Sequence, residues 1–132
     1  MDETQMQTRC PESPLLDRAR LEGWQFRINR RGYATIVPTP EAVVHGLLWR
    51  LTRADEDALD RYEGIREGLY IKHRLRPTRI PNQAVAAMVY LAADCQPGPP
   101  RPGYLEGIIA AAQRRGFPEE YVRELERWNT SA

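Results

Sequence analysis

The order of strand-like and helix-like stretches constrains the fold of this chain more than any other feature. Strand patterns dominate the first two-thirds of the chain, and helical spacing of apolar residues dominates the end. This order predicts an α+β domain with a small, mostly antiparallel, strongly curved sheet and flanking helices. Gly23 marks an expected bend, and Gly46 marks an expected bulge or close neighbour. The expected strands are residues 19–29, 33–37, 42–51, 69–75 and 84–92.

Helix boundaries are indicated by residues with known capping preferences. Thr52 has the chemistry of an N-cap, and Gly64 suits the position that follows the end of the same helix. Pro11 ends the first expected helix, because proline disfavours helical geometry in the residue before it. The expected helices are residues 1–9, the stretch between Thr52 and Gly64, residues 104–115, and a last helix that begins after Pro118.

The chain has the size of one domain, and its 132 residues can bury a core without disulfides or metal. Residues 95–103 are rich in proline and predict an extended surface loop rather than a domain linker. The mostly apolar residues 84–92 are expected at the centre of the sheet. Cys10 and Cys95 show no metal-ligand spacing, which favours two reduced thiols and a cytoplasmic protein. We expect no metal and no cofactor.

Charge and hydropathy argue against two classes of partner. The formal net charge is +1, with 19 basic and 18 acidic residues, whereas a nucleic-acid binder needs a concentrated basic surface. Residues 72–76 are the most basic stretch, but their alternation is typical of a half-solvated strand. No apolar run approaches the length that spans a bilayer. We therefore expect neither nucleic acid nor membrane as a partner.

Residues 59–70 carry the clearest functional signal. Glu63 lies at the last turn of the second expected helix, just before Gly64 and ahead of a strand that opens with Tyr70. A carboxylate held there is a candidate for proton transfer. The alternative is an ordinary solvated glutamate, which is the commoner case for this residue type. Glu67 is expected in a solvated loop, because Gly64 breaks the helical register between the two carboxylates.

Other polar and aromatic residues have structural interpretations. Tyr62, Trp49 and Trp24 are expected to be core or half-buried aromatics. His45 and His73 are far apart in the sequence, and a single histidine in a strand is more often structural than catalytic.

The segment around Glu63 resembles the acidic-glycine segment of the γ-glutamylcyclotransferase family, in which Leu-Asp-x-x-Glu-Gly-Val/Ile is followed by Gly-x-Tyr. Further matches occur in the family's order and approximate spacing. They are Arg9-Cys10-Pro11, Ala19-Arg20-Leu21, Gly23-Trp24, Gly32-Tyr33-Ala34-Thr35-Ile36-Val37-Pro38, Val44-His45-Gly46-Leu47-Leu48-Trp49, Pro102-Gly103-Tyr104 and Gly116-Phe117-Pro118.

The resemblance implies a small mixed barrel with flanking helices and a lyase that converts a γ-glutamyl amine or amino acid to 5-oxoproline and free amine. It implies that Glu63 is the acid/base residue and that Tyr104 helps to hold the small-molecule substrate. Tyr70 matches a tyrosine regularly found after the acidic segment, for which packing is the alternative role. The family acts without metal or cofactor and varies in its leaving group, so the resemblance does not specify the amine.

The 132 residues depart from the family at their N-terminal end. The family opens with an apolar strand and a Tyr-Gly-Ser-Asn loop whose backbone amides cradle the γ-glutamyl group, and neither occurs here. We therefore expect an N-terminally incomplete domain whose unpaired sheet edge can recruit a second copy of the chain. The competing hypothesis is a non-catalytic small-molecule-binding or interaction domain that retains the fold.

Overall fold

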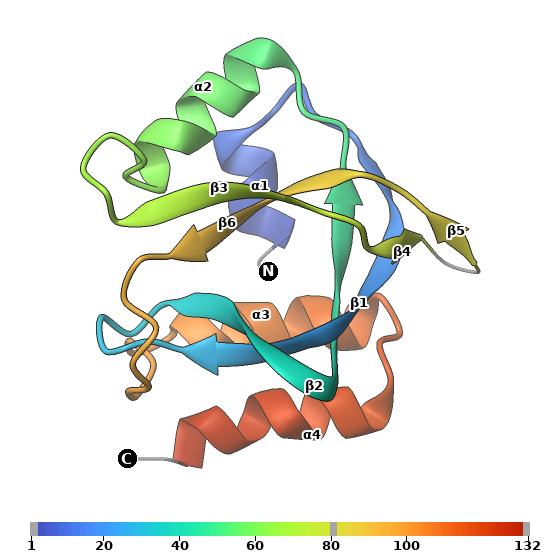
Figure 1. Cartoon of the computed structure of the whole chain (residues 1–132), viewed down its shortest axis with the longest axis vertical. Helices are drawn as coiled ribbons and strands as arrows, with labels where there is room; N and C mark the ends of the chain where they lie inside the picture. Colours follow the sequence, from blue (N-terminus) through green and yellow to red (C-terminus); the bar gives the residue numbers. More distant parts are fainter. Residues whose placement is uncertain (1–2, 80–81, 131–132) are drawn as a thin grey trace.

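The computed structural model describes residues 3–79 and 82–130 and shows an α+β domain, as predicted (Figure 1). The helices expected from the capping residues are all present, and Met1 and Asp2 lie outside the described residues. In chain order the elements are α1 (Glu3–Arg9), β1 (Leu15–Ile28), β2 (Ala34–Trp49), α2 (Arg53–Tyr62), β3 (Tyr70–Leu75), β4 (Thr78–Arg79), β5 (Gln83–Ala84), β6 (Ala87–Ala92), α3 (Tyr104–Arg114), α4 (Glu119–Glu126) and the 3₁₀ helix η1 (Arg127–Thr130).

The described strands form two sheets rather than a closed barrel. One sheet has the order β2-β1-β4-β5, and the other pairs β3 with β6. The short hairpin of β4 and β5 was not predicted from the sequence. The expected central position of residues 84–92 is wrong, because among the described strands β6 pairs only with β3.

A long antiparallel hairpin of β1 and β2 is the backbone of the larger sheet. The two strands expected at 33–37 and 42–51 are one strand in the structure, bent near Glu41, where φ is 67°. Gly23 lies at the register shift on the opposite strand with φ of 84°, which confirms the predicted bend. The expectation for Gly46 is wrong: it pairs regularly with Ala19, and a Cβ there would meet no atom within 4 Å.

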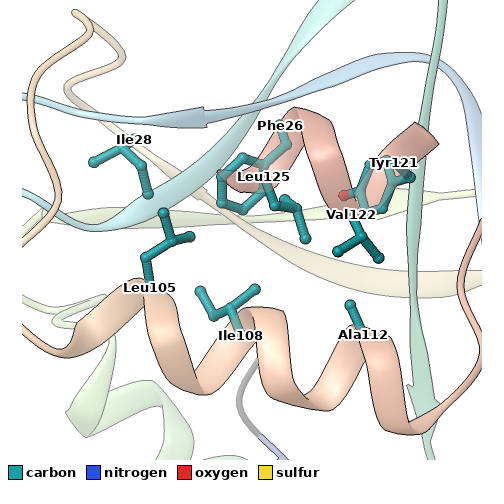
Figure 2. Packing of buried hydrophobic residues seen from close by; sticks show 8 residues of the cluster. All are labelled: Phe26, Ile28, Leu105, Ile108, Ala112, Tyr121, Val122 and Leu125. Atoms are coloured by element: carbon teal, nitrogen blue, oxygen red, sulfur yellow. The ribbon is translucent and has the colours of Figure 1, made fainter. Parts of the chain in front are cut away.

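The main hydrophobic core lies between this hairpin and the two C-terminal helices; in Figure 1, α3 lies behind the hairpin and α4 below it. Figure 2 shows how side chains of β1 point toward α3 and α4. The fully buried residues of this core include Ile28, Leu105 and Leu125. A second cluster of Met6, Cys10 and Leu59 packs α1 against α2. Together these clusters hold helices on both sides of the sheets.

The two sheets are joined at both ends, by a hydrogen bond between β6 and β2 at one end and, at the other, where β3 leads into β4, which pairs with β1 at Ala19 and Arg20. At the first of these ends the backbone N–H of Ala92 in β6 donates to the hydroxyl of Thr35 in β2, at 2.9 Å. Beyond it lies a cavity of about 1170 Å³, lined by residues of both sheets and by α1, α2, α3 and α4. Its volume slightly exceeds the roughly 300–1,000 Å³ typical of small-molecule sites.

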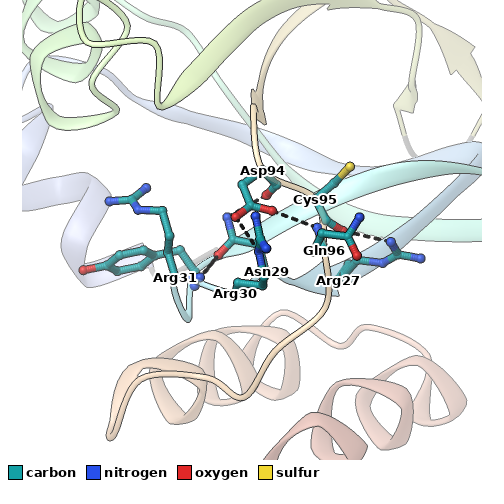
Figure 3. A network of polar contacts seen from close by, with 8 residues as sticks. Arg27, Asn29, Arg30, Arg31, Asp94, Cys95 and Gln96 are labelled. Atoms are coloured by element: carbon teal, nitrogen blue, oxygen red, sulfur yellow. Dashed lines mark hydrogen bonds and ion pairs between the residues drawn. The ribbon is translucent and has the colours of Figure 1, made fainter.

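The turn between β1 and β2 is organised by Asn29, which is completely buried. Its side-chain oxygen accepts hydrogen bonds from the backbone N–H groups of Arg31 and Tyr33, at 3.0 and 3.1 Å, and its side-chain nitrogen donates to the carbonyl of Asp94. Figure 3 shows this network, in which Arg30 also reaches the Asp94 carboxylate at 2.9 Å. Asn29 thus fixes both the turn and the loop that follows β6.

Replacing Asn29 with alanine should lower the free energy of unfolding by about 1–3 kcal/mol, because two backbone N–H groups lose their acceptor. Urea denaturation followed by circular dichroism measures the change. Arg30→Ala is the matched control, since it removes only an exposed ion pair and should cost less than about 1 kcal/mol. Equal effects of the two substitutions would contradict the central role of Asn29.

Candidate functional site

Helix α2 delivers Glu63 to the cavity. The helix begins at the N-cap Thr52, whose hydroxyl accepts from the backbone N–H of Asp55 at 3.1 Å, and Glu63 is its C-cap. Gly64 follows with φ of 63°, as its predicted place after the helix requires. A Cβ at Gly64 would lie 2.8 Å from Leu69 Cδ1, so the chain turns here only with glycine. This turn leads directly into β3.

The carboxyl group of Glu63 is half-buried and lines the cavity. Burial raises its pKa above the ordinary value of 4.5, and the nearby Arg9 guanidinium opposes the rise. A carboxyl with a raised pKa exchanges protons more readily near neutral pH than an exposed one.

Tyr70 and Tyr104 reach the same cavity from β3 and α3, and both hydroxyls hydrogen-bond to the backbone of Ala34. Tyr70 donates to the Ala34 carbonyl at 2.9 Å, and Tyr104 accepts from the Ala34 N–H at 3.1 Å. Burial raises the pKa of both phenols, and the Glu63 charge raises each further. Because Tyr104 accepts here, its own O–H proton is available for another partner.

Among the residues of the cavity wall that were not predicted as site residues from the sequence are Arg9, Arg31 and Tyr33. The Tyr33 ring packs edge-on against Tyr104, with centroids 5.3 Å apart. The Arg9 guanidinium lies 4.4 Å from the centre of the Tyr62 ring. In the sequence, Arg30 and Arg31 stand in the predicted turn before Tyr33, but sequence alone does not say which of the two faces the cavity.

The remaining sequence-predicted residues take structural or solvent-exposed positions, although Tyr62 and His45 also line the cavity. Tyr62 is 61% exposed, so its predicted place in the core is wrong. It belongs to the last turn of α2, and Arg9 covers its ring. Glu67 is exposed, as expected. His45 packs against Tyr121, with ring centroids 4.9 Å apart, and burial lowers its pKa.

Metal-binding and membrane-spanning features can be assessed for the part of the chain that the structure describes. Within residues 3–79 and 82–130, no group of three or more His, Cys, Asp or Glu side chains could hold a metal ion. Cys10 and Cys95 are both free, as predicted, the first buried and the second exposed. None of the described helices combines the length and apolar character needed to cross a membrane.

The site therefore combines the half-buried Glu63 carboxyl, two phenols that both bond to Ala34, and Arg9 and Arg31, in the wall of a cavity that Arg20, Arg74 and Arg79 also line. The carboxyl can accept and return a proton, the Tyr104 hydroxyl can donate a hydrogen bond, and the arginines can bind anions. This set of groups suits the transfer of a proton within a small, charged substrate.

Comparison with known proteins identifies relatives of the chain. Over 110 residues it is 28% identical to the gamma-glutamylcyclotransferase of Mus musculus and 27% identical to that of Homo sapiens. The match covers 83% of this chain and 58% of each relative, so the chain spans little more than half their length. A solved gamma-glutamyl cyclotransferase superposes with a TM-score of 0.84 at 24% identity, over 93% of this chain and 79% of that one.

A family model also matches the sequence directly. Residues 43–125, more than half of the chain, match the AIG2-like family, and this range includes Glu63, Tyr70 and Tyr104. The fold agrees with the likeness to the solved cyclotransferase. The chain therefore belongs to the AIG2-like family.

Proposed function

We propose that this chain is a γ-glutamylcyclotransferase-type lyase domain, which converts a γ-glutamyl amine or amino acid to 5-oxoproline and free amine. The observation that carries the proposal is the half-buried Glu63 carboxyl, with its raised pKa, in one cavity with Tyr70 and Tyr104. The names of the mouse and human relatives support the same reaction.

In the proposed reaction, the α-amine of the γ-glutamyl group attacks its own γ-carbonyl carbon. The amine is protonated at neutral pH, so Glu63 first takes a proton from it as general base. A carbon–nitrogen bond closes the five-membered lactam, and the original γ-amide bond breaks. Glu63 gives this proton to the departing amine nitrogen and then takes the second proton that the ring nitrogen must lose, which ends on the released amine as its ammonium form. Atoms and protons balance without a metal, cofactor or covalent enzyme intermediate.

The two tyrosines suit different parts of this substrate. The Tyr104 O–H, whose oxygen already accepts from Ala34, can donate to a substrate carboxylate or carbonyl oxygen. The Tyr70 hydroxyl donates to Ala34, which leaves its oxygen to accept from the substrate ammonium. Ala34 thus orients both phenols toward complementary roles.

The second candidate is a binding domain that holds a small molecule without turning it over. The observation that favours it is the cavity itself, whose volume of about 1170 Å³ between the two sheets is enough to hold a small molecule. Calorimetry with a γ-glutamyl substrate, run beside a 5-oxoproline assay, separates the candidates. Binding without product release would favour the second one.

Two broader proposals accompany the reaction. The pair of free cysteines supports a cytoplasmic location. The described strands form two open sheets, which supports self-association through strand pairing, since unpaired edges recruit other chains.

Replacing Glu63 with glutamine should lower 5-oxoproline release by at least about a hundredfold, because the amide cannot carry the proton. Product analysis by chromatography measures the rate, and thermal unfolding checks the fold. Glu67→Gln, which neutralises an exposed carboxylate four residues away, should keep wild-type turnover. A folded Glu63→Gln protein with near-full activity would exclude Glu63 as the base.

The pH dependence of kcat/KM should report the environment of Glu63. The base acts only when deprotonated, so activity should rise with pH through the pKa of Glu63, above 4.5. Arg9 lowers that pKa, so Arg9→Gln should move the acid limb to higher pH, whereas Arg9→Lys should leave it nearly in place. An acid limb at the same pH in all three proteins would refute this electrostatic coupling.

Replacing Tyr104 with phenylalanine should weaken the reaction by about 1 kcal/mol, or roughly fivefold in kcat/KM, through loss of one neutral hydrogen bond to substrate. Steady-state kinetics measures the change. Tyr62→Phe, which removes an exposed hydroxyl from a nearby ring, serves as the control and should be silent. Unchanged kinetics in Tyr104→Phe would assign Tyr104 to packing alone.

A further inference from the structure

Arg31 occupies a defined position in the cavity wall. The Asn29 side chain accepts its backbone N–H at 3.0 Å, and the Arg101 side chain donates to its carbonyl at 3.0 Å. Figure 3 shows that the Arg31 side chain extends away from the polar network around Asp94. The backbone N–H and the carbonyl of Arg31 are therefore both hydrogen-bonded, while its guanidinium points away from the network around Asp94.

The guanidinium of Arg31 lies 5.3 Å from the centre of the Tyr33 ring, and that of Arg101 lies 4.9 Å from it. Both distances are within the range of cation–π attraction. Of these two arginines, only Arg31 lines the cavity, where it is half-buried. An arginine that contacts a ring in this way retains N–H groups that can bind a carboxylate in a bidentate manner.

No carboxylate that the structure describes forms an ion pair with Arg31 or with Arg9. The neighbouring Arg30, by contrast, pairs with Asp94, and Lys72 pairs with Glu56 and Asp60. Partly buried guanidinium groups without an acidic partner are expected to bind anions from solution.

The two arginines lie in different parts of the site. The Arg9 guanidinium lies 4.4 Å from the ring centre of Tyr62, the residue before Glu63, whereas that of Arg31 lies 5.3 Å from the ring centre of Tyr33. In agreement with this placement, the charge of Arg9 lowers the pKa of Glu63 and Tyr104, and the charge of Arg31 lowers that of Tyr70. In a γ-glutamyl amide the α-amine and α-carboxylate share one carbon, so the base that takes the amine's proton also lies near the α-carboxylate. This places the α-carboxylate beside Arg9 and leaves Arg31 for a second anion.

We propose that Arg31 binds a carboxylate on the leaving amine and so selects γ-glutamyl amino acids over γ-glutamylamines. This inference rests on the proposed function and adds to it the residue that recognises the leaving group. The aromatic contact with Tyr33 and the hydrogen bonds of the turn hold Arg31 for this purpose.

The test compares two substrates that differ only in the leaving-group carboxylate: γ-glutamyl-L-alanine and γ-glutamylethylamine. The wild-type protein should prefer the alanine substrate in kcat/KM. Arg31→Gln should lose about 10- to 100-fold on that substrate, mainly through KM, and change little on γ-glutamylethylamine. Arg31→Lys should retain part of the preference. Arg30→Gln, an adjacent exposed arginine outside the cavity wall, should behave as wild type.

The other outcomes separate this inference from the proposed function. An equal loss of kcat/KM on both substrates in a folded Arg31→Gln protein would exclude Arg31 as the residue that recognises the leaving-group carboxylate. It would leave the proposed cyclisation unaffected. Equal wild-type rates on the two substrates would do the same. If the wild-type protein releases 5-oxoproline from neither substrate, the proposed function fails, and the inference about Arg31 fails with it.

Discussion

The backbone of Ala34 joins the parts of this molecule on which the site depends. Its carbonyl accepts from Tyr70 of β3, and its N–H donates to Tyr104 of α3. One residue later, Thr35 accepts the N–H of Ala92 in β6. Side chains, rather than a backbone ladder, therefore hold the two sheets together at this end. At the other end β3 leads into β4, which pairs with β1, and the cavity occupies the space between these two junctions.

The chemistry of the proposed site follows from a balance between burial and charge at Glu63. Burial favours the protonated carboxyl, and the Arg9 guanidinium favours the ionised one. The effect of burial is larger, so the pKa of Glu63 is raised, which favours proton exchange near neutral pH while the ionised form can still form. Gly64 makes this placement possible, because only glycine combines the left-handed backbone with the close approach of Leu69. The same turn carries the chain directly from the base to Tyr70.

The turn that contains Arg31 connects substrate selection to a distant loop. Asn29 binds the backbone of this turn and the carbonyl of Asp94, so the segment that follows β6 sets the position of the cavity wall. The bond from Arg101 to the Arg31 carbonyl adds the segment before α3 to the same assembly. Changes in either loop would therefore move Arg31, and with it the proposed leaving-group contact, while Glu63 stays in place.

The amino-acid sequence determined the local elements, because caps, turns and apolar periodicity act over a few neighbouring residues. Thr52 and Gly64 predicted the limits of α2, Gly23 predicted a bend, and the family resemblance singled out Glu63, Tyr70 and Tyr104. The lining of one cavity by these three residues, the exposure of Tyr62, the edge position of β6 and the inward-facing Arg31 were decided by tertiary structure. Each of these features depends on contacts between segments far apart in the chain. Local sequence patterns do not specify which strand edges pair or which side chains come into contact.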